Sequence, residues 1–125
     1  MVNIAQYDLD TAEAMLKAGR YLYVAFVCQQ AIEKLAKGLY VHTFDEEAKY
    51  THNINLVLGD IEAITSSEKY KLYENHFDDL SGYYLVGRYD TYKQELSHKF
   101  DKAFAKATYD KTKEAFTWLQ SLAKP

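Results

Sequence analysis

Four histidines are the residues best suited to acid–base chemistry, because imidazole is the side chain that gains and loses a proton near neutral pH. None of them belongs to a ligand pattern as specific as His-Glu-x-x-His, so their spacing does not predict a zinc site. His76 and Asp79 would share one helix face, which is only a weak metal signal, and we interpret them as part of a solvated polar face. The histidines are His42, His52, His76 and His98.

A group of polar side chains on one predicted helix offers a second kind of chemistry. Gln30, Glu33, Lys34 and Lys37 share one polar face of that helix. One interpretation, which we favour, is a solvated face with local charge pairs. The other is the polar wall of a cleft, where Lys34 meets a phosphate or a carboxylate of a partner.

Arg88 is the third candidate, and it is one of only two arginines in the chain. It stands beside Tyr89, at the start of a predicted connection between helices. Its forked guanidinium donors suit a phosphate or a structural carboxylate equally well. The simplest role for Arg88 is a tether between helices, and the simplest role for His52 is a bond from a helix N-terminus to a nearby loop.

Other reactive patterns are missing. The chain has no phosphate-binding glycine loop, no cysteine pair for zinc and no Gly-x-Ser-x-Gly elbow. Cys28 is the only cysteine, so a disulfide within the chain is impossible, and its apolar surroundings predict a small buried residue rather than a reactive thiol. The net charge of -3 does not favour a general binder of polyanions.

Long helices must position these residues. A chain of 125 residues is the size of one domain, residues 1–125, and its only proline is Pro125. Apolar residues recur at helical spacing in five segments, and no stretch shows sustained strand-like alternation. We therefore predict an all-α, antiparallel bundle of four or five helices. The segments are about 3–19, 21–41, 51–61, 65–84 and 98–123.

Several helix ends follow from capping patterns. Asn3 and Thr65 each begin a capping-box pattern, and Thr51 suits the N-cap of the short third helix. Gly19 suits a C-terminal stop, because glycine readily takes the left-handed backbone conformation found there.

The fourth segment carries a seam of aromatic residues at heptad steps. Aromatic residues make up 15% of the chain, a surplus for a bundle this small. Exposed apolar surface of this kind usually marks an interface, so we predict a homodimer. The seam consists of Tyr70, Tyr73, Phe77 and Tyr84.

Three blocks on this helical frame resemble the HEPN domain family, and the similarity covers almost the whole chain. The first is an opening helical hairpin with an Asp-Leu, a small-residue turn, and a Gln-rich helix bearing Glu-Lys. The second is a Thr-His-Asn before the short helix, and the third is a Gly-Arg-Tyr-Asp close to the family's Ala-Arg-Tyr-Pro. The matching residues are Asp8, Leu9, Gly19, Gln29, Gln30, Glu33, Lys34, Thr51, His52, Asn53, Gly87, Arg88, Tyr89 and Asp90.

The resemblance implies partners and a possible activity. HEPN domains are commonly homodimers, and many are encoded beside small nucleotidyltransferases in toxin–antitoxin or defence pairs. Some are metal-independent ribonucleases that use an Arg, four to six intervening residues, and a His. This chain departs from that motif: the nearest pair is Arg88 and His98, with nine residues between them.

The resemblance also predicts a site, because an antiparallel bundle can bring its three blocks together in one polar cleft with Lys34, His52 and Arg88. We predict a ligand- or partner-binding site without metal or cofactor. Its residues are Gln30, Glu33, Lys34, His52, Arg88 and Tyr89.

Three functions fit these observations. The first is an interaction module that pairs with a nucleotidyltransferase and helps to hold a nucleotide or RNA. The second is a ribonuclease with a rearranged Arg/His site, and the third is a small-ligand-binding bundle without a partner. The polar N-terminus and the lack of a long apolar run predict a cytoplasmic protein that binds no membrane, and we expect no DNA binding.

Overall fold

The computed structural model describes residues 2–87 and 90–123, with side chains for 4–85 and 90–123, and within these ranges it contains helices and no strand. The prediction of an all-α bundle is confirmed. None of the described helices combines the length and the apolar character needed to cross a membrane. The elements are α1 (Val2–Lys17), α2 (Tyr21–Phe44), α3 (Ile54–Leu58), α4 (Glu62–Thr65), α5 (Glu68–Tyr83), the 3₁₀ helix η1 (Tyr84–Gly87), α6 (Asp90–Ser97) and α7 (Lys102–Ser121).

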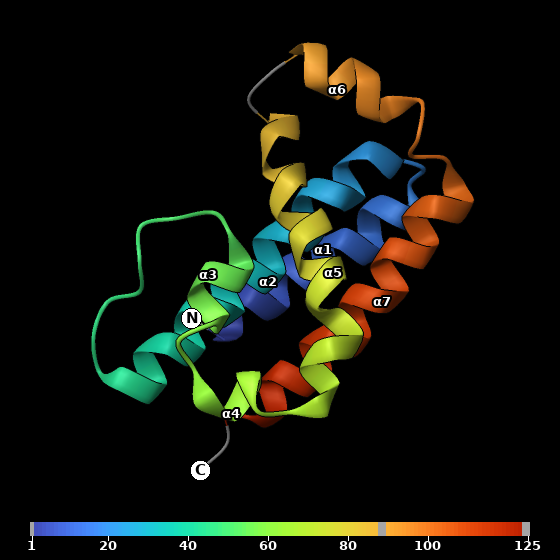
Figure 1. Cartoon of the computed structure of the whole chain (residues 1–125). Helices are drawn as coiled ribbons and strands as arrows, with labels where there is room; N and C mark the ends of the chain where they lie inside the picture. Colours follow the sequence, from blue (N-terminus) through green and yellow to red (C-terminus); the bar gives the residue numbers. More distant parts are fainter. Residues whose placement is uncertain (1, 88–89, 124–125) are drawn as a thin grey trace.

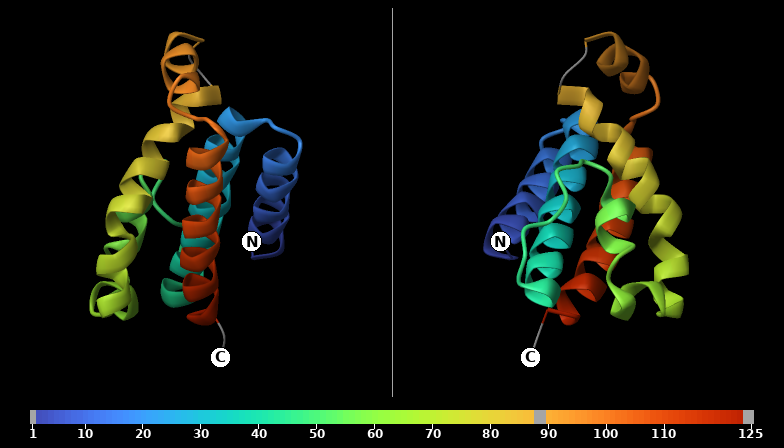
Figure 2. Two further views of the ribbon diagram at one scale, coloured as in Figure 1. Left: turned by 90° about the vertical axis from the view of Figure 1, so that its right-hand side faces the viewer. Right: turned by 60° about the vertical axis from the view of Figure 1, so that its left-hand side comes forward.

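The four long helices α1, α2, α5 and α7 run alternately in opposite directions (Figures 1 and 2). α1 and α2 form a hairpin, and α5 and α7 both pack against α2. The short helices lie in the connections: α3 and α4 join α2 to α5, and α6 joins α5 to α7 at the far end of the bundle (Figure 1).

α2 is the central helix, because α1, α3, α5, η1, α6 and α7 all contact it. Its apolar residues recur at the predicted helical spacing and are buried. Burial of one Val, Leu or Ile side chain stabilises the fold by roughly 1.5–3 kcal/mol. Two polar residues, Gln29 and Glu33, are buried with them, which the apolar pattern did not predict. The buried apolar residues of α2 are Val24, Ala25, Cys28, Ala31, Ile32, Leu35, Ala36 and Leu39.

The ends of the first helix are partly as predicted. Gly19 has a φ of 77°, the left-handed conformation that ends α1 and that side chains disfavour. The predicted capping role of Asn3 is wrong, because α1 begins at Val2 and Asn3 lies inside it.

Two further caps lie two residues later than predicted. Asn53 rather than Thr51 caps α3, and its side-chain oxygen accepts a hydrogen bond from the backbone N–H of Leu56 at 3.3 Å. Ser67 rather than Thr65 caps α5, and its hydroxyl accepts from the backbone N–H two residues on, at 3.2 Å. In both cases a stronger cap stands closer to the helix than the one that the pattern indicated.

The last helix begins later than predicted, so His98 lies in the turn before it. Asp101 caps α7, and its carboxylate accepts from the backbone N–H of Phe104 at 2.8 Å. The residues before this turn form α6, which was predicted as part of a connection. α6 has a single buried residue, Leu96, and therefore shows no repeating apolar pattern.

The aromatic seam of α5 faces the interior of the bundle. Phe77 is fully buried and Tyr70 is 9% exposed. Tyr73 packs on Trp118 of α7, with ring centroids 5.8 Å apart. Tyr70 and Phe77 are therefore in the core, whereas Tyr73 and Tyr84 are partly buried, so the seam exposes less apolar surface than the prediction of a homodimer assumed. The homodimer itself stays a prediction.

Candidate functional site

Glu33 is the centre of a polar cluster on α2, which we call the Glu33 cluster and which contains Gln29, Gln30, Glu33, Lys37 and His52. Glu33 is 8% exposed. Its Oε1 accepts from Gln29 Nε2 at 2.6 Å and lies 2.9 Å from His52 Nδ1, and its Oε2 accepts from Lys37 Nζ at 3.3 Å. These bonds compensate the carboxylate for lost hydration and fix its position.

His52 reaches Glu33 from the loop between α2 and α3. The hydroxyl of Thr51 accepts from the backbone N–H of Asn53 at 3.1 Å, which closes a tight turn around the histidine. Ser81 of α5 then accepts from the N–H of Ile54 at 3.0 Å and fixes the start of α3 against α5. Contact with a carboxylate places the proton of neutral His52 on Nδ1 and leaves Nε2 as its lone-pair nitrogen.

Gln30 and Lys34 have different surroundings, although they are close to Glu33 in the sequence. Gln30 Nε2 donates to Gln29 at 2.6 Å and so belongs to the Glu33 cluster. Lys34 donates instead to Asp8 Oδ2 of α1, at 2.6 Å. Among the described residues no hydrogen bond links Lys34 to His52, so the two face separate carboxylates rather than each other.

A row of rings extends from the cluster to the surface. The His52 ring stacks on Tyr84, with centroids 3.7 Å apart and planes 14° apart. The Tyr50 ring lies 6.5 Å from that of His52 and is completely exposed. Neither tyrosine was predicted as a site residue, although Tyr50 stands next to the Thr-His-Asn block as the only tyrosine in a polar loop.

A hollow of about 330 Å³ opens beside this row, between the end of α2 and the loop that follows. Lys37 lines it and also bonds to Glu33, so the hollow adjoins the Glu33 cluster. Lys49 also lines it and pairs with Asp60 at 2.7 Å. The two ammonium groups thus have carboxylate partners, and Glu47 adds a further negative charge.

Arg88 and Tyr89 lie outside the described residues. Of the six predicted site residues, the structure joins Gln30, Glu33 and His52 in one cluster and places Lys34 in a separate ion pair.

His76 is half-buried and not fully solvated as we predicted, whereas Asp79 is exposed. Its Nε2 lies 2.9 Å from the Thr112 hydroxyl, which itself donates to the carbonyl of Thr108 at 2.7 Å. Because the Thr112 hydroxyl donates its proton to this carbonyl, it can only accept from His76. Nε2 of His76 is therefore the donor. Burial, aided by the positive charge of Lys111, lowers the pKa of His76 to about 4.

Cys28 is fully buried, as predicted. Burial raises the pKa of its thiol to about 12, with a small opposing effect from the Thr112 hydroxyl. The thiolate is therefore absent at neutral pH, and the residue acts in packing. Among the described residues, no group of three or more His, Cys, Asp or Glu side chains is arranged to hold a metal ion.

The family model described as the HEPN domain matches residues 1–122. No curated protein and no solved structure gives a significant match to the chain.

Proposed function

Because the chain belongs to the HEPN domain family, a family of helical nucleotide- or RNA-associated modules, we propose that it is an interaction module that pairs with a nucleotidyltransferase. The module acts as a homodimer, in a toxin–antitoxin or defence-type pair. Its binding surface is the Glu33 cluster with the adjoining hollow.

The charge balance of this surface is the observation that carries the proposal. Glu33 with Lys37 and Lys49 with Asp60 are ion pairs, so the surface has no excess of positive charge. A general RNA binder would need such an excess to neutralise phosphates. A pre-positioned set of donors and acceptors instead suits a partner protein or a nucleobase, which are recognised through hydrogen bonds and stacking.

The row of rings is the proposed place for the base. An exposed tyrosine beside a histidine provides a stacking surface, and stacking of one base on one aromatic ring contributes about 1–3 kcal/mol. The Tyr50 ring is exposed, and Lys37 lines the hollow next to it.

Calorimetry with ATP as the probe tests the nucleotide part of the proposal. We expect Tyr50→Ala to weaken ATP binding at least fivefold, the low end of the stacking contribution. Tyr7→Ala is the matched control, because Tyr7 is a 73% exposed tyrosine on α1. Equal ATP binding by both variants and the parent would exclude Tyr50 as the base platform.

Co-expression with the protein encoded beside this chain, which we expect to be a nucleotidyltransferase, tests the partner. A tagged chain should retain that enzyme through size-exclusion chromatography, and Lys49→Glu should weaken the complex by reversing a charge that lines the hollow. Light scattering of the chain alone should give twice its 14.5 kDa mass. A monomer, or no complex with the enzyme, would refute the respective part of the proposal.

One observation keeps the ribonuclease alternative in view. His52 is oriented by Glu33 through Nδ1, which is how a carboxylate holds a histidine for proton transfer at Nε2. A ribonuclease built on this pair would use His52 rather than His98, which is exposed in the turn before α7.

A further inference from the structure

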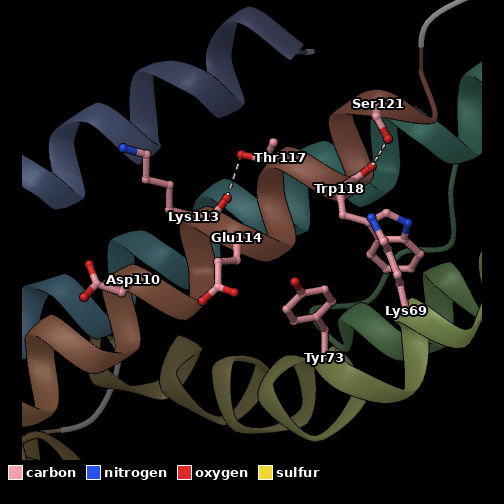
Figure 3. A pocket seen from close by; sticks show the side chains of 8 residues that line it. All are labelled: Lys69, Tyr73, Asp110, Lys113, Glu114, Thr117, Trp118 and Ser121. Atoms are coloured by element: carbon pink, nitrogen blue, oxygen red, sulfur yellow. Dashed lines mark hydrogen bonds between the residues drawn. The ribbon is translucent and has the colours of Figure 1, made fainter.

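A second cavity, of about 560 Å³, lies between α5 and α7 and shares no residue with the Glu33 cluster (Figure 3). Its volume is within the usual range for small-molecule sites. We call it the α5–α7 cavity. Its lining residues are Lys69, Tyr73, Asp110, Lys113, Glu114, Thr117, Trp118 and Ser121.

Two aromatic rings form the floor of this cavity. Trp118 is 7% exposed, and its indole lies 5.8 Å from the Tyr73 ring, with the planes 30° apart. Lys111 lies 5.7 Å from the Tyr73 centroid and helps to hold that ring in place. An aromatic, apolar lining of this kind favours a ligand with an aromatic body.

Charges of opposite sign stand at the two ends of the floor. Asp110 and Glu114 are one turn apart on α7, whereas Lys69 of α5 lies beside Trp118 (Figure 3). Asp110 already pairs with Lys106 at 2.8 Å. Within the described part of the chain, neither Glu114 nor Lys69 takes part in an ion pair, so each can meet a charged ligand group.

Lys113 does not balance Glu114, although both line the cavity. Figure 3 shows its side chain directed toward α1 and away from Tyr73. Its charge also contributes to the lowered pKa of Glu13 on α1, after the larger effects of Tyr109 and Lys17. Among the described side chains, Glu114 therefore keeps a carboxylate that no ion pair occupies.

We propose that the α5–α7 cavity binds a small aromatic zwitterion. The aromatic body lies on Trp118 and Tyr73, an ammonium group faces Glu114, and an anionic group faces Lys69. A ligand with one charge would leave one end of the cavity unmatched, and a polyanion would be repelled by Asp110 and Glu114. The proposal is independent of the function proposed for the Glu33 cluster.

Trp118 makes the test direct, because it is the only tryptophan of the chain and lies in the cavity. The probe is 4-(aminomethyl)benzoate, a ring with an ammonium and a carboxylate at opposite ends. We expect a saturable change in tryptophan emission and a matching calorimetric isotherm. Benzylamine and benzoate, which lack one charge each, should bind about threefold to fivefold more weakly, the upper part of the range for one exposed ion pair. 6-Aminohexanoate, which lacks the ring, should bind more weakly still.

Two substitutions assign the ends of the ligand. Glu114→Gln should weaken binding of the probe and of benzylamine about threefold to fivefold and leave benzoate unchanged. Lys69→Gln should weaken the probe and benzoate and leave benzylamine unchanged. Lys71→Gln is the control, because Lys71 is an exposed lysine of α5 that does not line the cavity. All three variants should keep the helical circular dichroism of the parent.

Three outcomes would overturn the proposal. The first is no saturable signal from the probe by either method. The second is binding of benzoate or benzylamine as tight as that of the probe. The third is equal weakening by the substitution at Lys71.

Discussion

The Glu33 cluster and the α5–α7 cavity both contain glutamate and lysine side chains, but these side chains differ in burial and in ion pairing. In the cluster the carboxylate is 8% exposed and every charged group has a partner. In the cavity Lys69 and Glu114 are exposed, whereas Trp118 is buried and Tyr73 is partly buried. A buried carboxylate with several partners stabilises the fold, whereas an exposed charge without a partner contributes little to stability. Substitution of a charged residue in the cluster should therefore lower the stability of the fold. Substitution of a charged residue in the cavity should change ligand binding and leave stability nearly unchanged.

Replacement of the central carboxylate is the strongest test of this contrast. Glu33→Ala leaves the donors of Gln29, Lys37 and His52 without their acceptor, and we expect it to lower the free energy of unfolding by about 2–4 kcal/mol. Glu114→Ala is the matched control and should stay within about 0.5 kcal/mol of the parent. Urea denaturation measures both. Equal losses would remove the distinction between the two regions.

The pH dependence of stability tests the packing beneath the cavity. His76 lies on α5 three residues after Tyr73, and its pKa is about 4 in the folded chain against 6.5 for an ordinary histidine. The unfolded chain therefore binds more protons between about pH 6.5 and 4, and stability falls as the pH falls through this window.

His76→Gln isolates this contribution, because it keeps a donor near Thr112 but cannot titrate. Between pH 7 and 4.5 the parent should lose about 2 kcal/mol more of its free energy of unfolding than the variant, measured by urea denaturation. Parallel pH profiles would mean that His76 is solvated in the folded chain.

The ion pair between α1 and α2 should contribute less, because the Lys34 side chain is 35% exposed and that of Asp8 is 17% exposed. A double-mutant cycle with Asp8→Asn and Lys34→Gln should give a coupling of about 0.5–1 kcal/mol. In 1 M NaCl the coupling should fall, because the screening length is then about 3 Å. A coupling of 3 kcal/mol would place this pair in the same class as the Glu33 cluster.

The smallest expected effect is the cleavage of RNA by the purified chain. We expect the purified chain to show weak or no cleavage of single-stranded RNA without added metal, because the spacing that holds an Arg and a His over one phosphate is missing. Robust cleavage that is lost in both Arg88→Ala and His98→Ala would place an active site there. Loss in His52→Ala and Glu33→Gln would instead make the Glu33 cluster catalytic. Cleavage unchanged in all variants would indicate a contaminant.

Sequence patterns predicted the helices in which apolar residues recur at regular spacing, because such patterns depend on nearby residues only. The apolar stripe of α2 and the glycine that ends α1 are local features, so the residues nearby determine them. α6 escaped prediction because it buries only Leu96 and therefore has no repeat to detect.

The site was less predictable, because its contacts join distant parts of the chain. Asp8 and Lys34 are 26 positions apart, and Glu33 and His52 are 19 apart. We favoured a solvated polar face for α2, yet the loop after α2 covers Glu33 and makes it a buried hydrogen-bond acceptor.

The α5–α7 cavity likewise depends on a contact between Tyr73 and Trp118 of two different helices, which no local sequence pattern specifies.

The central place of α2 has a consequence for hydrogen exchange. A helix packed on so many neighbours cannot open without the whole bundle opening, so its amides should exchange only through global unfolding. We therefore expect the backbone that carries Glu33 and Lys34 to exchange most slowly among the described helices. A ligand or partner that binds the Glu33 cluster should therefore contact a rigid α2 backbone. Any conformational change on binding should occur in the loop that carries Tyr50 and His52.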